Sequence, residues 1–200
     1  MGIFLIILSA AIVLAVLHMI APDHWVPLTV VSRKFNYSSA KTYEMALLIG
    51  ILHSAASVAV AVIAFYTGML LVRDSLYFLY LVSVILLIIV GIYFIVNGYV
   101  EKMEDPESST LSSKSILTVS IFPDFAFIPI MLAASVLSLI QVSAIVTSFI
   151  LLTCITVVIM TLGAAKGFSR AIEKIQPKYI DYIMGGILFL TAAIITVTTL

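Results

Sequence analysis

Long apolar runs separated by short polar segments occupy nearly the whole chain. Hydrophobic residues make up 63% of the 200 positions, and charged residues only 10%. A helix of about 20 apolar residues crosses the hydrocarbon core of a bilayer. We therefore predict an all-α integral membrane protein with six transmembrane helices, at about residues 2–31, 43–72, 76–100, 116–139, 142–162 and 180–200.

Charge and cysteine content exclude other classes of protein. The net charge is zero, so nothing suggests a basic surface for nucleic acid, and the expected surroundings are the lipid bilayer. The single cysteine, Cys154, excludes an intrachain disulfide and a redox relay between two cysteines. Residues 1–4 lack the basic segment of a cleavable signal peptide, so we interpret them as the start of the first span.

Basic residues gather in alternate loops, and this predicts the orientation in the membrane. Nine of the ten Lys and Arg residues lie in the first, third and fifth loops, which contain Arg33, Lys34, Lys41, Lys102, Lys114, Lys166, Arg170, Lys174 and Lys178. Loops rich in Lys and Arg stay on the cytoplasmic side. We expect a multi-pass protein of the plasma membrane with these three loops in the cytoplasm and both termini outside.

The first apolar run contains an unusual group of ionisable residues and prolines. His18, Asp23 and His24 lie within seven residues of one another, beside Pro22 and Pro27. Ionisable side chains inside a membrane segment are costly and are usually functional. Pro22 cannot donate a backbone hydrogen bond and clashes with the carbonyl of His18, so it should break the helix and let the three side chains converge. Imidazole and carboxylate ligands suit divalent first-row metals such as nickel, cobalt and zinc.

The two halves of the chain show a related pattern. Pro22-Asp23 and Pro123-Asp124 are 101 residues apart, and the same offset places His53 on Cys154. With three spans in each half, the second copy must run in the opposite direction, as in the inverted repeats of many transporters. We expect a first repeat at 1–100, a hydrophilic loop at 101–115 and a second repeat at 116–200, with helices one and four broken by proline.

Depth in the bilayer points to one polar layer. Asp23, His53, Asp124 and Cys154 each lie ten to twelve residues from a basic residue of the cytoplasmic side. At a helical rise this is about 15–18 Å, close to the midplane, where the binding site of a transporter is expected. Asp181 is instead expected near the cytoplasmic edge, paired with Lys178, and Asn97 at an interface or loop.

These residues resemble the signature of a known family. His18-x-x-x-x-Asp23-His24 has the form of the His-x4-Asp-His motif of nickel/cobalt transporters, and His53-Ser54 looks like the second motif of that family. The size and the paired halves are similar to the broader lysine-exporter superfamily. The resemblance covers about residues 14–60 and implies that His18, Asp23, His24 and His53 ligate the metal. Asp124 is then expected to add charge, and Cys154 is a weaker candidate ligand.

The function expected from the sequence is secondary transport of a divalent transition-metal cation by alternating access, with nickel, cobalt or zinc as substrate rather than cofactor. Imidazole binds metals in its neutral form, so binding should fall as the pH drops through about 6.5. An alternative is a transporter of the same fold for another small solute, with the His/Asp layer as a proton relay. Metal-dependent hydrolysis and electron transfer are less favoured, and we expect no catalytic residues. The sequence leaves the metal, the direction, the driving ion and a homodimer open.

Overall fold

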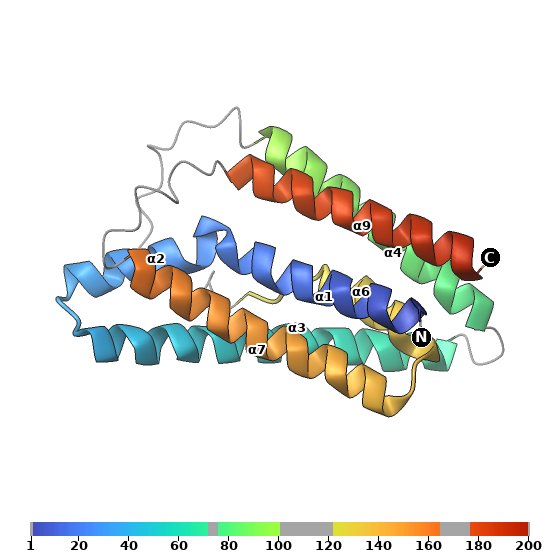
Figure 1. Cartoon of the computed structure of the whole chain (residues 1–200), viewed down its shortest axis with the longest axis horizontal. Helices are drawn as coiled ribbons and strands as arrows, with labels where there is room; N and C mark the ends of the chain where they lie inside the picture. Colours follow the sequence, from blue (N-terminus) through green and yellow to red (C-terminus); the bar gives the residue numbers. More distant parts are fainter. Residues whose placement is uncertain (1, 72–75, 101–121, 165–176, 200) are drawn as a thin grey trace.

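Helices account for every regular element in the part of the chain that the computed structural model describes, residues 2–71, 76–100, 122–164 and 177–199. They run along one long axis and form an elongated bundle (Figure 1). Five helices are long and apolar enough to cross a membrane: Gly2–Lys34, Ser39–Thr67, Tyr77–Val100, Leu139–Gly163 and Lys178–Thr198. This confirms the all-α class and is consistent with a multi-pass membrane protein.

The helix bounds follow the apolar runs, with differences at the ends. The first span consists of α1 (Gly2–Ile20) and α2 (Pro22–Lys34), and it is followed by α3 (Ser39–Leu71) and α4 (Leu76–Val100). The second half contains α7 (Leu139–Gly163) and α9 (Pro177–Thr199). The second span therefore begins at Ser39, earlier than expected, because the polar turn after α2 is only four residues long.

The structure describes only part of the predicted fourth span. Residues 116–121 of the predicted span, and the loop at 101–115, lie outside the described residues. From residue 122 the chain is not helical until α6 (Phe127–Ala133), which continues into a short 3-10 helix, η1 (Ala134–Val136). Together these ten residues are too short to cross a bilayer, which needs about 20.

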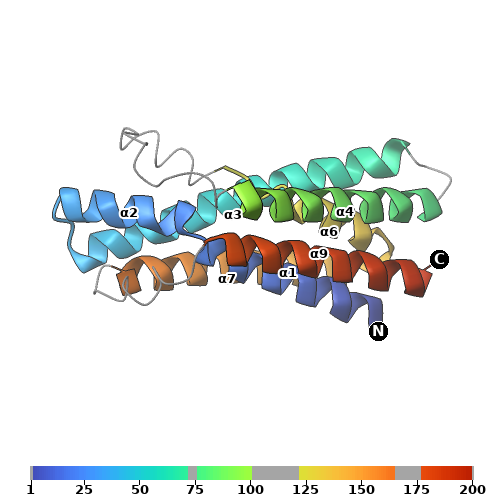
Figure 2. The ribbon, with the colours of Figure 1, turned by 90° about the horizontal axis from the view of Figure 1, so that it is seen from above.

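Packing brings together helices that are distant in the sequence. α4 lies along α9, α3 along α7, and α1 contacts both α7 and α9, whereas α6 lies between α3 and α4. The start of α1 and the end of α9 are at one end of the bundle, and the turn between α2 and α3 is at the other (Figures 1 and 2). The largest apolar core takes buried residues from α1, α3, α4, α6, α7 and α9, and it includes Phe127 and Phe149, whose rings stack with centroids 4.0 Å apart.

Glycines allow α4 and α9 to approach at backbone distance. A Cβ atom at Gly185 would lie 2.8 Å from the carbonyl oxygen of Gly91, and one at Gly98 would lie 2.9 Å from the carbonyl oxygen of Lys178. Small residues drive helix association in membranes because they let backbones pack closely. Gly186, beside Gly185, has no such neighbour within 4 Å.

We expect Gly185→Val to lower the thermal unfolding temperature of the detergent-purified protein, because the added carbons would overlap Gly91 and Ile95. Overpacking of this kind costs about 1–3 kcal/mol. Gly186→Val is the matched control, since a Cβ there meets open space, and it should unfold at the wild-type temperature. Equal unfolding temperatures for the two variants would contradict the close crossing of α4 and α9.

Candidate metal centre

The first span is broken where the sequence predicts it. Ala21 has an extended ψ of 138° between the two helical segments, and Pro22 starts α2. Pro suits the first turn of a helix because its missing N–H would have no partner there. The indole nitrogen of Trp25 donates to the carbonyl oxygen of Ile20 at 2.9 Å, so a buried side chain satisfies a carbonyl that the break leaves without its usual helical partner. α2 then continues through Pro27 without a second break.

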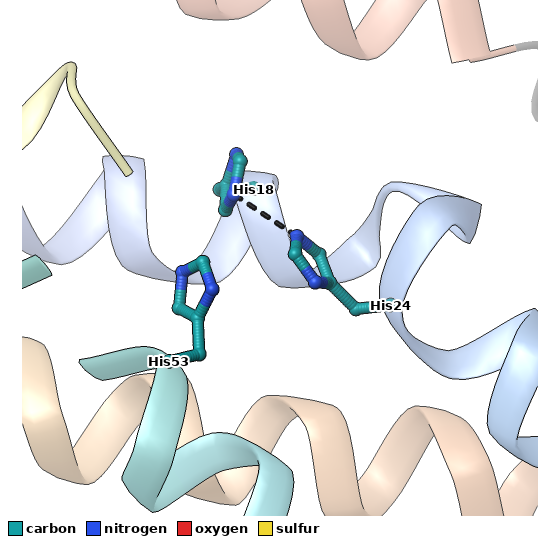
Figure 3. A group of neighbouring side chains, drawn as sticks. All are labelled: His18, His24 and His53. Atoms are coloured by element: carbon teal, nitrogen blue, oxygen red, sulfur yellow. Dashed lines mark hydrogen bonds between the residues drawn. The ribbon is translucent and has the colours of Figure 1, made fainter. Parts of the chain in front are cut away.

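The break brings three imidazoles together at the junction of three helices. His18 comes from the last turn of α1, His24 from the first turn of α2 and His53 from the middle of α3 (Figure 3). One donor nitrogen from each ring can be chosen so that all three lie within 4.8 Å of one another. His24 and His53 are buried, and His18 is partly buried. The three residues that the sequence places on two different spans therefore form one cluster.

Distances within the cluster fit a metal ion. The Nε2 atoms of His18 and His24 are 3.0 Å apart. Two nitrogens about 2.1 Å from one ion, at octahedral or tetrahedral angles, lie about 3.0–3.4 Å apart. The His53 ring lies with its centroid 5.3 Å from that of His18 and 4.7 Å from that of His24, so a small rotation of side chains would complete a three-nitrogen site.

His53 is the most unusual member of the cluster. Its side chain is 0% exposed, and neither ring nitrogen makes a hydrogen bond within the described residues. The backbone of Phe122 interacts with the ring without completing a hydrogen bond of good geometry. A buried polar group without a partner costs about 1–3 kcal/mol. This arrangement has little structural benefit, and a bound ion would supply the missing partner.

Asp23 lies at the edge of the cluster. Its Oδ2 is 3.4 Å from Nε2 of His24, and its side chain is 53% exposed. It is not among the residues whose donor atoms all lie within 4.8 Å of one another. A carboxylate that orients a metal-binding imidazole contacts the ring nitrogen that does not bind the metal. Asp23 instead contacts Nε2 of His24, the nitrogen that also contacts His18, so its position suits an ion shared with that nitrogen.

Asp124 lies at the break of the second half, outside the imidazole cluster. It is 4% exposed, its Oδ1 accepts from the amide of Ala126 at 2.9 Å, and its own amide donates to Oγ of Ser57 at 2.8 Å. Ser57 in turn donates to the carbonyl oxygen of His53 at 2.8 Å. Asp124 is thus linked to α3 one turn beyond His53. Its Oδ2 has no hydrogen-bond partner among the described residues.

Cys154 does not join the cluster. It is buried on α7, where α7 crosses α3 so closely that a Cβ at Gly50 would lie 3.0 Å from the Cα of Cys154. Its side chain interacts with Ser54, the residue after His53. The shared offset of 101 residues therefore brings Cys154 to the helix that carries His53, but not to its ring.

Two residues that the sequence did not assign to the site lie near it. Asp181 is 7% exposed, and its Oδ2 accepts a hydrogen bond from Nδ2 of Asn97 at 2.6 Å. The expected ion pair with Lys178 is absent among the described residues, since α9 turns Asp181 toward α4. Burial of a carboxylate in an apolar helix was the signal that could have identified it.

A cavity of about 580 Å³ lies beside the imidazole cluster, lined by His18 and His24 but not by His53. It contains the break in each half of the chain and the facing parts of α4 and α9. The polar residues of its lining are His18, Asp23, His24, Asn97, Asp124 and Asp181, together with Tyr93. Neither Lys nor Arg is among the described residues that line it. Three carboxylates in a lining without Lys or Arg make this cavity suitable for a cation.

Comparison with protein-family models, with curated proteins and with solved structures gave no match.

Proposed function

We propose that the chain is a secondary transporter that moves a divalent transition-metal cation, nickel or cobalt by preference, across the cytoplasmic membrane by alternating access. The observation that carries the proposal is the buried cluster of His18, His24 and His53, in which the His53 ring has no hydrogen-bond partner among the described residues. Imidazole is a preferred ligand of nickel, cobalt and zinc. Within a membrane segment such a cluster is expected at an ion path.

The packing of the helices supports the finer proposal of six spans in two inverted repeats. With α1, α3 and α4 as one repeat and α6, α7 and α9 as the other, exchanging the repeats leaves the pattern of contacts unchanged. The contact of α1 with α7 corresponds to that of α6 with α3, and the contact of α1 with α9 to that of α6 with α4. The pairs α3–α7 and α4–α9 map onto themselves. Matched helices also run in opposite directions along the bundle (Figure 1).

The location of the cluster favours transport over storage or structure. Breaks in membrane helices place backbone and side-chain ligands near the midplane, between repeats that can rock against each other. Here the break at Pro22-Asp23 and the break at Pro123-Asp124 line one cavity, between the α4–α9 pair and the rest of the bundle. Movement of the α4–α9 pair would change access to the imidazoles without moving α3 or α7. The positive-inside rule favours a cytoplasmic location for the turn between α2 and α3.

Isothermal titration of the detergent-purified protein with Ni²⁺, Co²⁺, Zn²⁺ and Mn²⁺ tests this proposal. We expect tight binding of Ni²⁺ or Co²⁺, with one ion on the imidazoles, and its loss in the His18→Ala/His24→Ala variant. Metal accumulation by cells or vesicles that contain the protein should be lost in the same variant. If the native protein bound none of the four ions, or the variant accumulated metal at the native rate, the proposal would be wrong.

One observation favours the alternative function, transport of another small solute driven by protons. The His18 and His24 rings share a hydrogen bond of 3.0 Å between their Nε2 atoms, an arrangement that can pass a proton. This alternative predicts that no transition metal raises the thermal unfolding temperature. Binding to the native state at 100 times Kd would raise stability by about 2.7 kcal/mol, so a metal-dependent shift separates the two functions.

A further inference from the structure

Asp181 from α9 and Asp23 from α2 line the same cavity as the imidazoles of His18 and His24, and Asp23 lies beside His24. Carboxylates that share a cavity inside a membrane segment are stabilised by a cation between them. The imidazoles, which are neutral when they ligate a metal, cannot offset the double charge of the ion.

Asn97 holds Asp181 in place for this role. Its amide donates to Oδ2 of Asp181 at 2.6 Å, which leaves Oδ1 without that constraint. The two residues lie on α4 and α9, whose backbones are in contact at Gly98 and Lys178, so the pair is fixed to a closely packed interface. Outer-shell partners of this kind orient ligands in metal sites.

Asp124 provides an independent observation on the same cavity. Although it is 4% exposed and lines the cavity, its Oδ2 has no hydrogen-bond partner within the described residues. A buried carboxylate oxygen without a partner is costly unless a cation or proton compensates its charge. The lining of the cavity therefore includes a carboxylate charge that the imidazole cluster does not offset.

The volume of the cavity fits a hydrated ion. Six waters occupy about 180 Å³ at about 30 Å³ each, well below the cavity volume of about 580 Å³. Oxygen ligands and retained water suit hard divalent cations such as Mg²⁺ and Mn²⁺, whereas imidazole suits nickel and cobalt. The cavity thus offers two kinds of coordination side by side.

We propose that Asp181 and Asp23 form a second cation subsite, which binds a divalent cation with part of its water shell next to the imidazole cluster, while Asp124 contributes charge. This proposal rests on the proposed transport function and adds a step to it. The ion exchanges water for imidazole as it moves from the carboxylate subsite to the imidazole cluster. Asp181 is a ligand, and Asn97 is a positioning residue that keeps the carboxylate turned toward the cavity.

The test measures Mn²⁺ and Ni²⁺ binding by the full-length protein in detergent. Free Mn²⁺ has a sharp electron paramagnetic resonance signal that decreases on binding, and Mn²⁺ is the weakest of the first-row ions for imidazole. Asp181→Asn should weaken Mn²⁺ binding more than about tenfold, the scale of losing a partner of a metal ligand, and should keep Ni²⁺ on the imidazoles. His53→Leu should weaken Ni²⁺ binding and leave Mn²⁺ binding unchanged. Glu44→Gln, an exposed carboxylate paired with Lys41, is the control and should change neither.

The outcomes separate the subsite from the proposed function. Unchanged Mn²⁺ binding in Asp181→Asn, or parallel loss of both ions in Asp181→Asn and His53→Leu, would overturn the second subsite. With either of these outcomes, the imidazole site is still supported if His53→Leu no longer binds Ni²⁺. If the protein bound Mn²⁺ through Asp181 but bound no Ni²⁺, the subsite would be supported and the proposed function would be wrong. Asp181→Asn keeps an oxygen that can accept from Asn97. If that variant does not fold, Asn97→Ser provides the same decision: weaker Mn²⁺ binding, seen as a larger signal of free Mn²⁺, supports the subsite, and unchanged Mn²⁺ binding overturns it.

Discussion

Replacing His53 with Leu should abolish high-affinity binding of Ni²⁺ or Co²⁺ and leave the fold intact or more stable. The ring is 0% exposed and its nitrogens have no hydrogen-bond partner within the described residues, so a leucine of similar volume removes a cost rather than a contact. Loss of the third imidazole should raise Kd by at least about 100-fold, the upper end of the effect of removing an outer-shell partner. Titration calorimetry and thermal unfolding of the same preparations measure both effects.

A control variant on the neighbouring helix makes this result specific. Cys154→Ala alters a buried side chain that packs at the crossing of α3 and α7 but lies outside the imidazole cluster, so metal binding should stay at the native level. A merely structural role for His53 predicts the opposite pattern, a lower unfolding temperature for His53→Leu with unchanged metal affinity. That result would contradict the metal site.

Replacing Pro22 with Ala should weaken metal binding more than about tenfold without loss of helix content. The new N–H could donate to the carbonyl of His18 and join α1 to α2. At 3.6 residues per turn, six residues rotate His24 by about 240° from His18, so the two rings would point to different sides of a continuous helix. Titration with Ni²⁺ measures the metal affinity, and circular dichroism measures the helix content.

Pro27→Ala is the matched control for this prediction. Pro27 lies within α2, where the helix already continues past it, so its removal relieves a local strain and leaves the rings in place. It should bind metal as the native protein does and unfold at an equal or higher temperature. Native metal affinity in Pro22→Ala would show that tertiary packing, rather than the proline, holds the break.

Local chemistry alone predicted much of the fold. Apolar runs of 20 or more residues became helices because a bilayer requires every backbone hydrogen bond to be satisfied within the segment. Pro22 ended α1 because proline lacks the donor that a continuing helix needs. The inclusion of His53 in the site also came from sequence, by its depth and by the resemblance of His53-Ser54 to a second motif.

Convergence between helices was decided by the tertiary structure. Sequence spacing gives the depth of a residue but not the direction in which its helix turns the side chain. Cys154 has a depth matched to that of His53, but it contacts α3 at Gly50 rather than the His53 ring. The close crossing of α4 and α9 at their glycines turns Asp181 to Asn97 instead of Lys178. The sequence determined which polar groups lie within the membrane segments. Helix rotation and contact, which depend on residues far apart in the chain, decided which of them share the cavity.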